Sequence, residues 1–173
     1  MLSMVEYVHQ RVLTYDGEVA ADFTMGNGHD TYFLANQFAY VYAFDVQEEA
    51  VIKTQKRLKD YDNVTYILDD HKNMNHYFNS FDVGIFNLGF LPRSSSTVTT
   101  MLDSTKEAIV KAIDYVQKAL FIVVYPGHQE GYHESLWIDE YVKGLDGHMY
   151  NVSMFKMMNK RKAPYVIEIE KRL

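Results

Sequence analysis

The sequence predicts an α/β fold built on a seven-stranded, mostly parallel sheet whose last strand is antiparallel. Two observations lead to this prediction. Short apolar segments typical of buried strands alternate with segments of helical periodicity along the 173 residues. The last two apolar segments, at 151–158 and 165–170, are joined by a short connection typical of a hairpin, so they run in opposite directions. The alternation implies right-handed crossovers and helices on both faces of the sheet.

The first half of the chain contains four of the expected strands. A helix is expected over 4–13, where apolar residues recur at helical spacing, and Gly17 ends its connection to the first strand. The next helix follows a glycine-rich turn and ends near Gln37. A helix at 47–59 has a polar face, and a short helix is expected around 75–78. The strands of this half are expected at 18–21, 40–45, 64–68 and 82–87.

The second half begins with a loop at 88–96, which its composition indicates, and continues with a long amphipathic helix at 99–117. The following strand, 119–125, is the most apolar segment and is therefore expected near the centre of the sheet. A turn at 126–131 precedes a helix at 133–143 and the closing hairpin. Seven strands with the last one reversed form the pattern of class I S-adenosylmethionine-dependent methyltransferases, a Rossmann-like fold.

Length and composition favour a single domain spanning 1–173 with a sizeable core. Cysteine is absent, which excludes disulfides, thiolate metal sites and a cysteine nucleophile. A net charge of −6 argues against a broad nonspecific hold on nucleic acid but allows a local basic patch. No apolar run is long enough to cross a bilayer, and residues 1–12 lack the features of a secretory signal. We therefore expect a cytoplasmic protein with no membrane partner.

Residues 22–31 organise the predicted site, because they join a strand to a helix through a glycine-rich turn. Gly26 and Gly28 allow the chain to turn tightly and a ligand to approach the backbone. The N–H groups and positive dipole of the following helix favour an anionic ligand group at its start. A plain strand-to-helix turn with capping polar residues is the alternative interpretation.

Two residues of this stretch favour S-adenosylmethionine over a dinucleotide. A dinucleotide fingerprint needs Gly or Ala at the position that Thr31 occupies. Asp22 ends the first strand, and its carboxylate would repel a pyrophosphate but attract an amino-acid ammonium group. S-adenosylmethionine carries such an ammonium group and no phosphate. The cofactor contacts expected from this stretch are Asp22, Gly26, Asn27, Gly28, Asp30 and Thr31.

Acidic residues also end the next two strands. Asp45 has the spacing from the glycine turn, about 20 residues, that is typical of a ribose-binding acid, and Gln47 is expected beside it. The carboxylate of Asp45 can accept hydrogen bonds from vicinal hydroxyls, although a solvated acid that caps the next helix fits as well. Asp70 and His71 follow the third strand, where either can contact the adenine. His71 also fits a surface histidine.

Asn87 ends the fourth strand at the position where amino-group methyltransferases commonly place Asn or Asp before a tight turn and an aromatic residue. Its amide oxygen can accept a hydrogen bond from the target amine and aim the amine lone pair at the methyl group, which is catalysis by positioning. Leu88, Gly89 and Phe90 are expected at the substrate, with Phe90 stacking on a base. A glycine turn followed by a core aromatic residue is the alternative.

The turn after the fifth strand is expected to form the far wall of the same cleft. Tyr125 and His128 are candidates for contacting the substrate or moving a proton, and Pro126 and Gly127 for binding it. His128 also fits a solvated loop histidine. The seven histidines show no metal-ligand spacing supported by carboxylates, so no metal is expected.

Basic residues gather in the final hairpin, and Arg93 lies in a strand-end loop and is expected at the substrate. These side chains can hold the phosphates of an RNA, although a solvated hairpin tip explains them equally well. The basic residues of the hairpin are Lys156, Lys160, Arg161, Lys162, Lys171 and Arg172.

Three segments, 22–31, 86–92 and 125–131, resemble in order the signatures of the bacterial putative rRNA methylase family. The resemblance covers nearly the whole chain. It implies methyl transfer from S-adenosylmethionine to the 5-aminomethyl group of (2-thio)uridine at wobble position 34 of tRNA. It also implies the tRNA anticodon stem-loop as a partner and a homodimer as the assembly.

The chain departs from the family pattern at Met25, where cysteine is common, and at Phe90, where tyrosine is usual. Residues 93–96 also replace a glycine-rich run, so the departures concern substrate contacts more than cofactor contacts. We therefore predict a tRNA wobble-uridine methyltransferase. The alternatives are methylation of rRNA or a small molecule, a non-catalytic RNA-binding module and, disfavoured by Thr31 and Asp22, a nicotinamide oxidoreductase.

Overall fold

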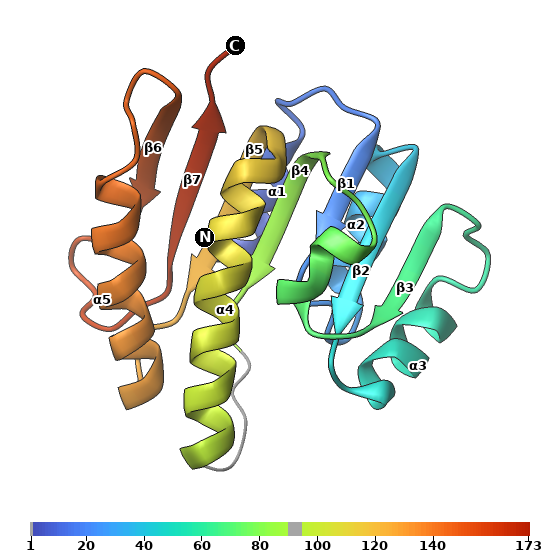
Figure 1. Cartoon of the computed structure of the whole chain (residues 1–173), viewed down its shortest axis with the longest axis horizontal. Coiled ribbons are helices and arrows are strands. Elements are labelled where there is room, and N and C mark those ends of the chain that lie inside the picture. The colour runs from blue at the N-terminus through green and yellow to red at the C-terminus, as the bar shows by residue number, and fades with distance from the viewer. Residues whose placement is uncertain (1, 90–94) are drawn as a thin grey trace.

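The computed structural model describes residues 2–89 and 95–173, which form a seven-stranded sheet in the order β3-β2-β1-β4-β5-β7-β6 (Figure 1). Neighbouring strands from β3 to β5 are parallel, whereas β7 is antiparallel to both β5 and β6. The predicted reversal of the last strand is therefore confirmed. The strands are β1 (Val19–Asp22), β2 (Tyr40–Asp45), β3 (Val64–Leu68), β4 (Phe81–Asn87), β5 (Val116–Val124), β6 (Tyr150–Phe155) and β7 (Tyr165–Lys171).

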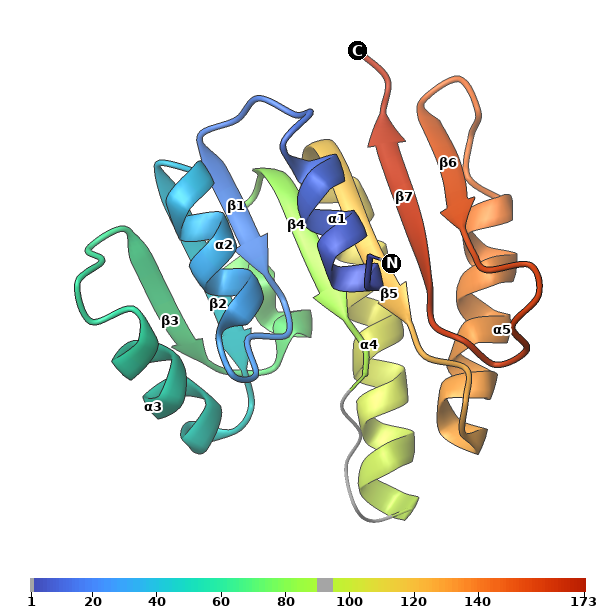
Figure 2. The same ribbon diagram turned by 180° about the vertical axis from the view of Figure 1, so that it is seen from behind.

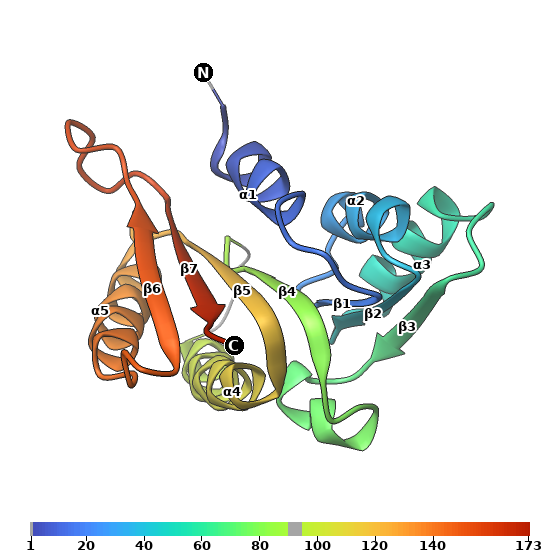
Figure 3. The same ribbon diagram turned by 90° about the horizontal axis from the view of Figure 1, so that it is seen from above.

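Helices cover both faces of the sheet, as the sequence predicts (Figures 2 and 3). α1, α2 and α3 lie on one face, and α4, α5 and the short 3₁₀ helix η1 lie on the other. Their bounds are α1 (Met4–Val12), α2 (His29–Gln37), α3 (Glu48–Arg57), η1 (His71–His76), α4 (Ser95–Tyr115) and α5 (Gln129–Lys143).

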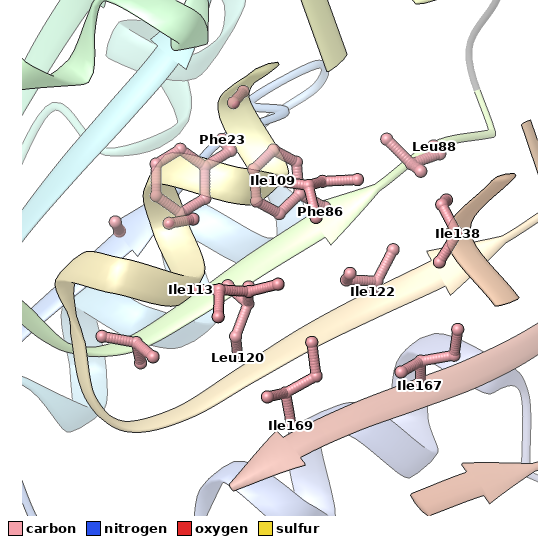
Figure 4. Packing of buried hydrophobic residues seen from close by; sticks show 14 of the residues in the cluster. Phe23, Phe86, Leu88, Ile109, Ile113, Leu120, Ile122, Ile138, Ile167 and Ile169 are labelled. Atoms are coloured by element: carbon pink, nitrogen blue, oxygen red, sulfur yellow. The ribbon is translucent and has the colours of Figure 1, made fainter. Parts of the chain in front are cut away.

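Each face of the sheet carries its own hydrophobic core. Along a strand, successive side chains alternate between the two faces, so Phe86 and Ile122 join the cluster under α4 and α5 (Figure 4). Their neighbours Ile85 and Phe121 join the cluster under α1 and α2. Because both faces are buried, the central strands are apolar at nearly every position, which explains their continuous apolar runs.

Two predicted helices are wrong in their limits. The short helix is η1 and not 75–78: Asp70 precedes it, and the Asp70 side chain accepts a hydrogen bond from the backbone N–H of Lys72. This local cap starts the turn earlier than the apolar pattern suggests. α4 begins at Ser95, inside the segment expected to be a loop, and ends at Tyr115.

The start of α5 also differs from the prediction, because Gly131 is helical and not part of a turn. A Cβ at Gly131 would lie 2.0 Å from the carbonyl oxygen of Tyr125, so this position needs glycine for close packing. The His128 side chain caps the helix by accepting a hydrogen bond from the Gly131 N–H at 3.1 Å. β5 likewise begins three residues earlier than expected, since Val116 is fully buried while Gln117 next to it is exposed.

A buried carboxylate fastens α1 to the sheet. Glu168 in β7 is 6% exposed and accepts hydrogen bonds from Nε and Nη2 of Arg11 at 2.9 and 2.7 Å. The hydroxyl of Tyr15 donates to the same carboxylate. These bonds join residues about 150 positions apart in the chain, and they therefore hold α1 against β7, the last strand of the chain.

We expect Glu168→Ala to lower the free energy of unfolding by about 2–4 kcal/mol, because Arg11 and Tyr15 lose their shared acceptor. Urea unfolding monitored by circular dichroism measures the change. The control is Glu140→Gln, which breaks an exposed pair with Lys143 and should cost at most about 0.5 kcal/mol. Equal effects of the two substitutions would show that the buried cluster adds no special stability.

Candidate active site

The strand ends that the sequence singles out meet at one edge of the sheet. Asp22 pairs with Ala43 of β2 on one side and with Ile85 of β4 on the other. Asp45 and Asn87 each follow two residues after these partners, so they lie at the same level on the same edge. In Figure 1 the parallel strands end together at this edge, which is the lower edge of the sheet in that view. In open α/β sheets, this is the edge at which ligands bind.

The turn between β1 and α2 packs directly against α3. Gly26 and Gly28 have φ angles of 52° and 83°, a region that favours glycine. A Cβ at Gly28 would also lie 2.8 Å from the Thr54 side chain. The predicted need for glycine at both positions is confirmed. The N-cap position of α2 is Gly28, which has no side chain to cap the first turn of the helix.

Hydrogen bonds tie this turn to the strands on both sides. Asp45 accepts from the backbone N–H of Gly26 with one oxygen and from that of Gln47 with the other, each at 2.9 Å. On the opposite side, the Thr24 hydroxyl accepts from the backbone N–H of Asn87 at 2.7 Å. Each oxygen of Asp45 keeps a second lone pair, so the carboxylate can still accept hydrogen bonds from a ligand.

Asp22 lies beneath the turn and is fully buried. Its carboxylate accepts a hydrogen bond from the Thr31 hydroxyl at 2.6 Å and another from the Thr24 N–H at 3.0 Å. Burial and, to a lesser extent, the negative charges of Asp30 and Asp45 raise the pKa of Asp22 to about 7, against the effect of these hydrogen bonds. The turn is therefore a site of negative potential. Such a site favours a cationic ligand group and repels a pyrophosphate.

Two further residues of the stretch are held by neighbours. Asp30 is buried, and its carboxylate lies 2.6 Å from Nε2 of His9, whose ring stacks on Phe33. The backbone oxygen of Asn27 accepts from Nε of Arg57 at 2.8 Å, which leaves the exposed Asn27 side chain at the surface of the turn.

The pair after β3 is engaged mainly within the protein. Asp70 accepts from the backbone N–H of Lys72 and from the Ser104 hydroxyl. His71 is buried, and its Nδ1 donates to the carbonyl oxygen of Phe23 at 2.8 Å. Burial lowers the pKa of His71, so the ring is neutral and Nε2 is an acceptor, for which the described residues supply no partner. His71 is thus no surface histidine, and the adenine contact stays a prediction for both residues.

Asn87, Gly89 and Tyr125 come together at the ends of β4 and β5. The Tyr125 ring would lie 2.9 Å from a Cβ at Gly89, so only glycine lets this ring pack on the turn. Burial raises the pKa of the Tyr125 hydroxyl, and a hydrogen bond from the Asn87 side chain lowers it. Leu88 is 7% exposed in the core and its backbone N–H donates to the Val123 carbonyl oxygen, so only its own carbonyl oxygen is left for the predicted substrate contact. Two predicted substrate residues lie outside the described side chains: Phe90 and Arg93.

A cavity of about 550 Å³ opens beside the turn that follows β5. Pro126, Gly127 and His128, which the sequence places at the substrate, line one side of it. The other side is lined by residues of α5 and of the β6–β7 hairpin, including Lys156 and Lys162. The lining contains none of the residues predicted to bind the cofactor, so the prediction that this turn forms the far wall of the cofactor cleft stays a prediction.

Sequence reasoning missed three contributors to the site. Thr24 and Thr54 hold the glycine turn, and their only sequence signal is their position in or opposite a strand-to-helix turn. Tyr132 lines the cavity, but its place in a helix gave no sign of a role. Among the described residues, no group of three His, Asp or Glu side chains is placed to hold a metal. No described helix is long and apolar enough to span a membrane.

Comparisons with known proteins point to one family. The family model of putative rRNA methylases matches residues 41–170. A curated relative from Arabidopsis thaliana, named tRNA (mnm(5)s(2)U34)-methyltransferase, chloroplastic, is 28% identical over 90% of this chain. The matched region covers 64% of that relative, so this chain spans less than two thirds of its length.

Two solved structures match nearly the whole chain. A putative methyltransferase from Streptococcus mutans, in complex with SAH, is 34% identical, with a TM-score of 0.88 and coverage of 99% of both chains. A putative rRNA methylase from Clostridium thermocellum is 30% identical, with a TM-score of 0.90 and the same coverage.

The buried carboxyl groups predict how stability depends on pH. The pKa of Asp22 is raised to about 7 in the folded state, so folding favours its protonated form and the free energy of unfolding falls as pH rises from about 4 to 7. Asp22→Asn removes this loss of stability, because an amide does not ionise. The Asn side chain can still accept a hydrogen bond from Thr24 and donate one to Thr31. We expect the variant to melt roughly 5 °C above the parent at pH 8, with a smaller difference at pH 5.

Glu134 provides the matched comparison for this experiment. It lies in α5, and burial raises its pKa to about 7 as well. Glu134→Gln should therefore give the same trend at a distance from the glycine turn. A difference in melting temperature that is independent of pH, measured by calorimetry at both pH values, would contradict the raised pKa.

Proposed function

Because the chain belongs to the putative rRNA methylase family, we propose that it is a methyltransferase that transfers a methyl group from S-adenosylmethionine to the 5-aminomethyl group of (2-thio)uridine at wobble position 34 of tRNA. Its fold is the class I methyltransferase fold that the strand pattern predicts. The named activity of the Arabidopsis relative supports the choice of substrate. The cytoplasmic location and the homodimer remain predictions of the sequence.

The negative potential at the glycine turn is the observation that carries this proposal. Asp22, Asp30 and Asp45 converge on the turn closely enough that the latter two raise the pKa of Asp22. S-adenosylmethionine has an ammonium group and a sulfonium group, and both positive charges are stabilised there. Its ribose hydroxyls can donate hydrogen bonds to the free lone pairs of the Asp45 carboxylate. Gln47 lies beside this carboxylate. The residues present therefore fit this cofactor.

Asn87 is proposed to position the substrate amine. The Asn87 side chain lies beside the Tyr125 hydroxyl, and its amide oxygen is a group that can accept a hydrogen bond from the amine. Bound S-adenosylmethionine supplies an electrophilic methyl group. An alkylamine has a pKa of about 10.4 in water, so it must lose a proton before its lone pair can attack. Partial burial beside Tyr125 favours the neutral amine, since desolvation lowers its pKa.

We expect Asn87→Ala to lower the methylation rate by about 100-fold, because the amine is no longer held in line with the methyl group. The affinity for S-adenosylmethionine should stay within a few-fold, since the backbone N–H of Asn87 still donates to Thr24. Asp22→Asn is the converse control, which should weaken cofactor binding by removing a negative charge. Calorimetry measures the affinity and mass spectrometry the methylated product. Normal turnover of Asn87→Ala would contradict the proposal that Asn87 positions the amine.

The tRNA substrate is tested in cells that lack the gene. We expect wobble nucleosides of their tRNA, analysed by mass spectrometry, to accumulate the 5-aminomethyl form and to lose the methylaminomethyl form. Expression of the parent chain, but not of Asn87→Ala, should restore the methylated nucleoside. Unchanged wobble uridines together with a missing methyl group in rRNA would contradict the tRNA assignment and indicate that rRNA is the substrate. Absence of any cofactor binding would instead favour a non-catalytic RNA-binding module.

A further inference from the structure

We propose that the cavity between α5 and the β6–β7 hairpin binds a single-stranded nucleotide of the RNA substrate next to the target nucleoside, its phosphate on two lysines and its base on an exposed tyrosine. This inference rests on the proposed function. The cavity measures about 550 Å³, within the range of about 300–1,000 Å³ of ligand-binding pockets. It is lined by the turn after β5, which begins next to Tyr125, and β5 pairs with β4, which ends at Asn87.

Positive charge is the first observation that supports this inference. Lys156 and Lys162 line the cavity from the hairpin, and both side chains are exposed, so their charges are available to a ligand. Among the described residues of the lining, Asp139 is the only acidic one, and it already accepts a hydrogen bond from the Tyr165 hydroxyl at 2.7 Å. A chain with a net charge of −6 thus presents a local excess of positive charge at this edge. Such an excess favours a phosphodiester.

Aromatic surface is the second observation. Tyr132 lines the cavity from α5 and is 52% exposed, so its ring is accessible to a ligand. An exposed aromatic ring next to lysines is the arrangement with which proteins hold single-stranded RNA, because every base can stack on the ring. Tyr165 below it is buried and carries the Lys156 ammonium 5.5 Å above its ring, which fixes one of the two charges.

Backbone strain is the third observation. Of the described residues other than glycine, Lys162 alone has a positive φ, at 62°. In this conformation the Cβ atom of lysine comes too close to the following carbonyl oxygen, whereas glycine has no Cβ atom. Its carbonyl oxygen would lie 3.4 Å from a Cβ at Gly127, so the strained residue rests on the turn after β5. Strained residues cluster at binding sites, and a lysine here supplies a charge that glycine cannot.

The strain makes Lys162→Gly an informative variant. Glycine relieves the strain, so this variant should unfold at the same urea concentration as the parent or a higher one. It should nevertheless bind RNA about 5-fold more weakly at 0.1 M salt, which is the loss expected for one phosphate contact on a single strand. Lys156→Met should weaken binding to the same extent. Each variant should reduce the slope of log affinity against log salt by about 0.7.

Matched controls lie on the same hairpin. Lys160→Gln and Arg161→Gln change the net charge by the same amount, but neither residue lines the cavity. Both should bind RNA within 2-fold of the parent. Tyr132→Ala should weaken binding about 10-fold, whereas Tyr132→Phe, which keeps the ring, should not. The probe is a fluorescein-labelled anticodon stem-loop of tRNA, measured by fluorescence polarisation with the full chain, and uridine monophosphate is the small-molecule arm.

The outcomes separate this inference from the proposed function. If the parent binds the stem-loop and methylates it but the cavity variants match the hairpin controls, the cavity assignment is overturned and the methyltransferase stands. If uridine monophosphate binds as tightly as the stem-loop, the cavity serves a free nucleotide and the RNA assignment is overturned. If the parent binds S-adenosylmethionine but no RNA, the tRNA substrate itself is wrong. Affinity for S-adenosylmethionine should be unchanged in every cavity variant.

Discussion

The two hydrogen bonds that hold the glycine turn between its neighbours are the constraint on which the rest of the site depends. Asp45 fixes Gly26 from β2, and Thr24 fixes Asn87 from β4. Because both bonds use backbone N–H groups, they fix the path of the main chain and not merely the side chains. The glycine turn, Asp45 and the backbone of Asn87 at the end of β4 therefore keep one relative geometry. A methyl transfer that relies on alignment needs this rigidity before a substrate arrives.

The same arrangement has an electrostatic cost in the protein without its ligand. A fully buried carboxyl group with a pKa near 7 lies close to two other acids, so its ionisation is opposed at neutral pH. The hydrogen bonds from Thr31 and Thr24 offset only part of this effect. A cationic ligand would offset more of it, since its charge favours the ionised form. Affinity for the ligand is in this way linked to a destabilising feature of the free protein.

The sequence was sufficient to predict the mostly parallel sheet, the reversed last strand and the meeting of Asp22, Asp45 and Asn87, because parallel strands end at one edge. It failed where tertiary packing decides. The sequence predicted Gly131 to be a turn residue, but Gly131 is helical, and the Tyr125 carbonyl oxygen packs against it where a side chain would otherwise lie. A surface side chain was one of two interpretations of His71, yet its ring is buried and bonded to the Phe23 carbonyl oxygen. Neither contact has a local sequence signal, since each joins segments that only the fold brings together.

The turn after β5 links the two halves of the site, because its residues face both. The Tyr125 ring packs on Gly89 beside Asn87, whereas Pro126, Gly127 and His128 line the cavity. Gly131 fixes both halves at once, since its missing side chain leaves room for the Tyr125 carbonyl oxygen and for the His128 ring. A change that displaces this turn must therefore alter the position of the Tyr125 hydroxyl as well as the shape of the cavity. In the proposed function, recognition of a flanking nucleotide and placement of the reacting amine therefore depend on the same few backbone atoms.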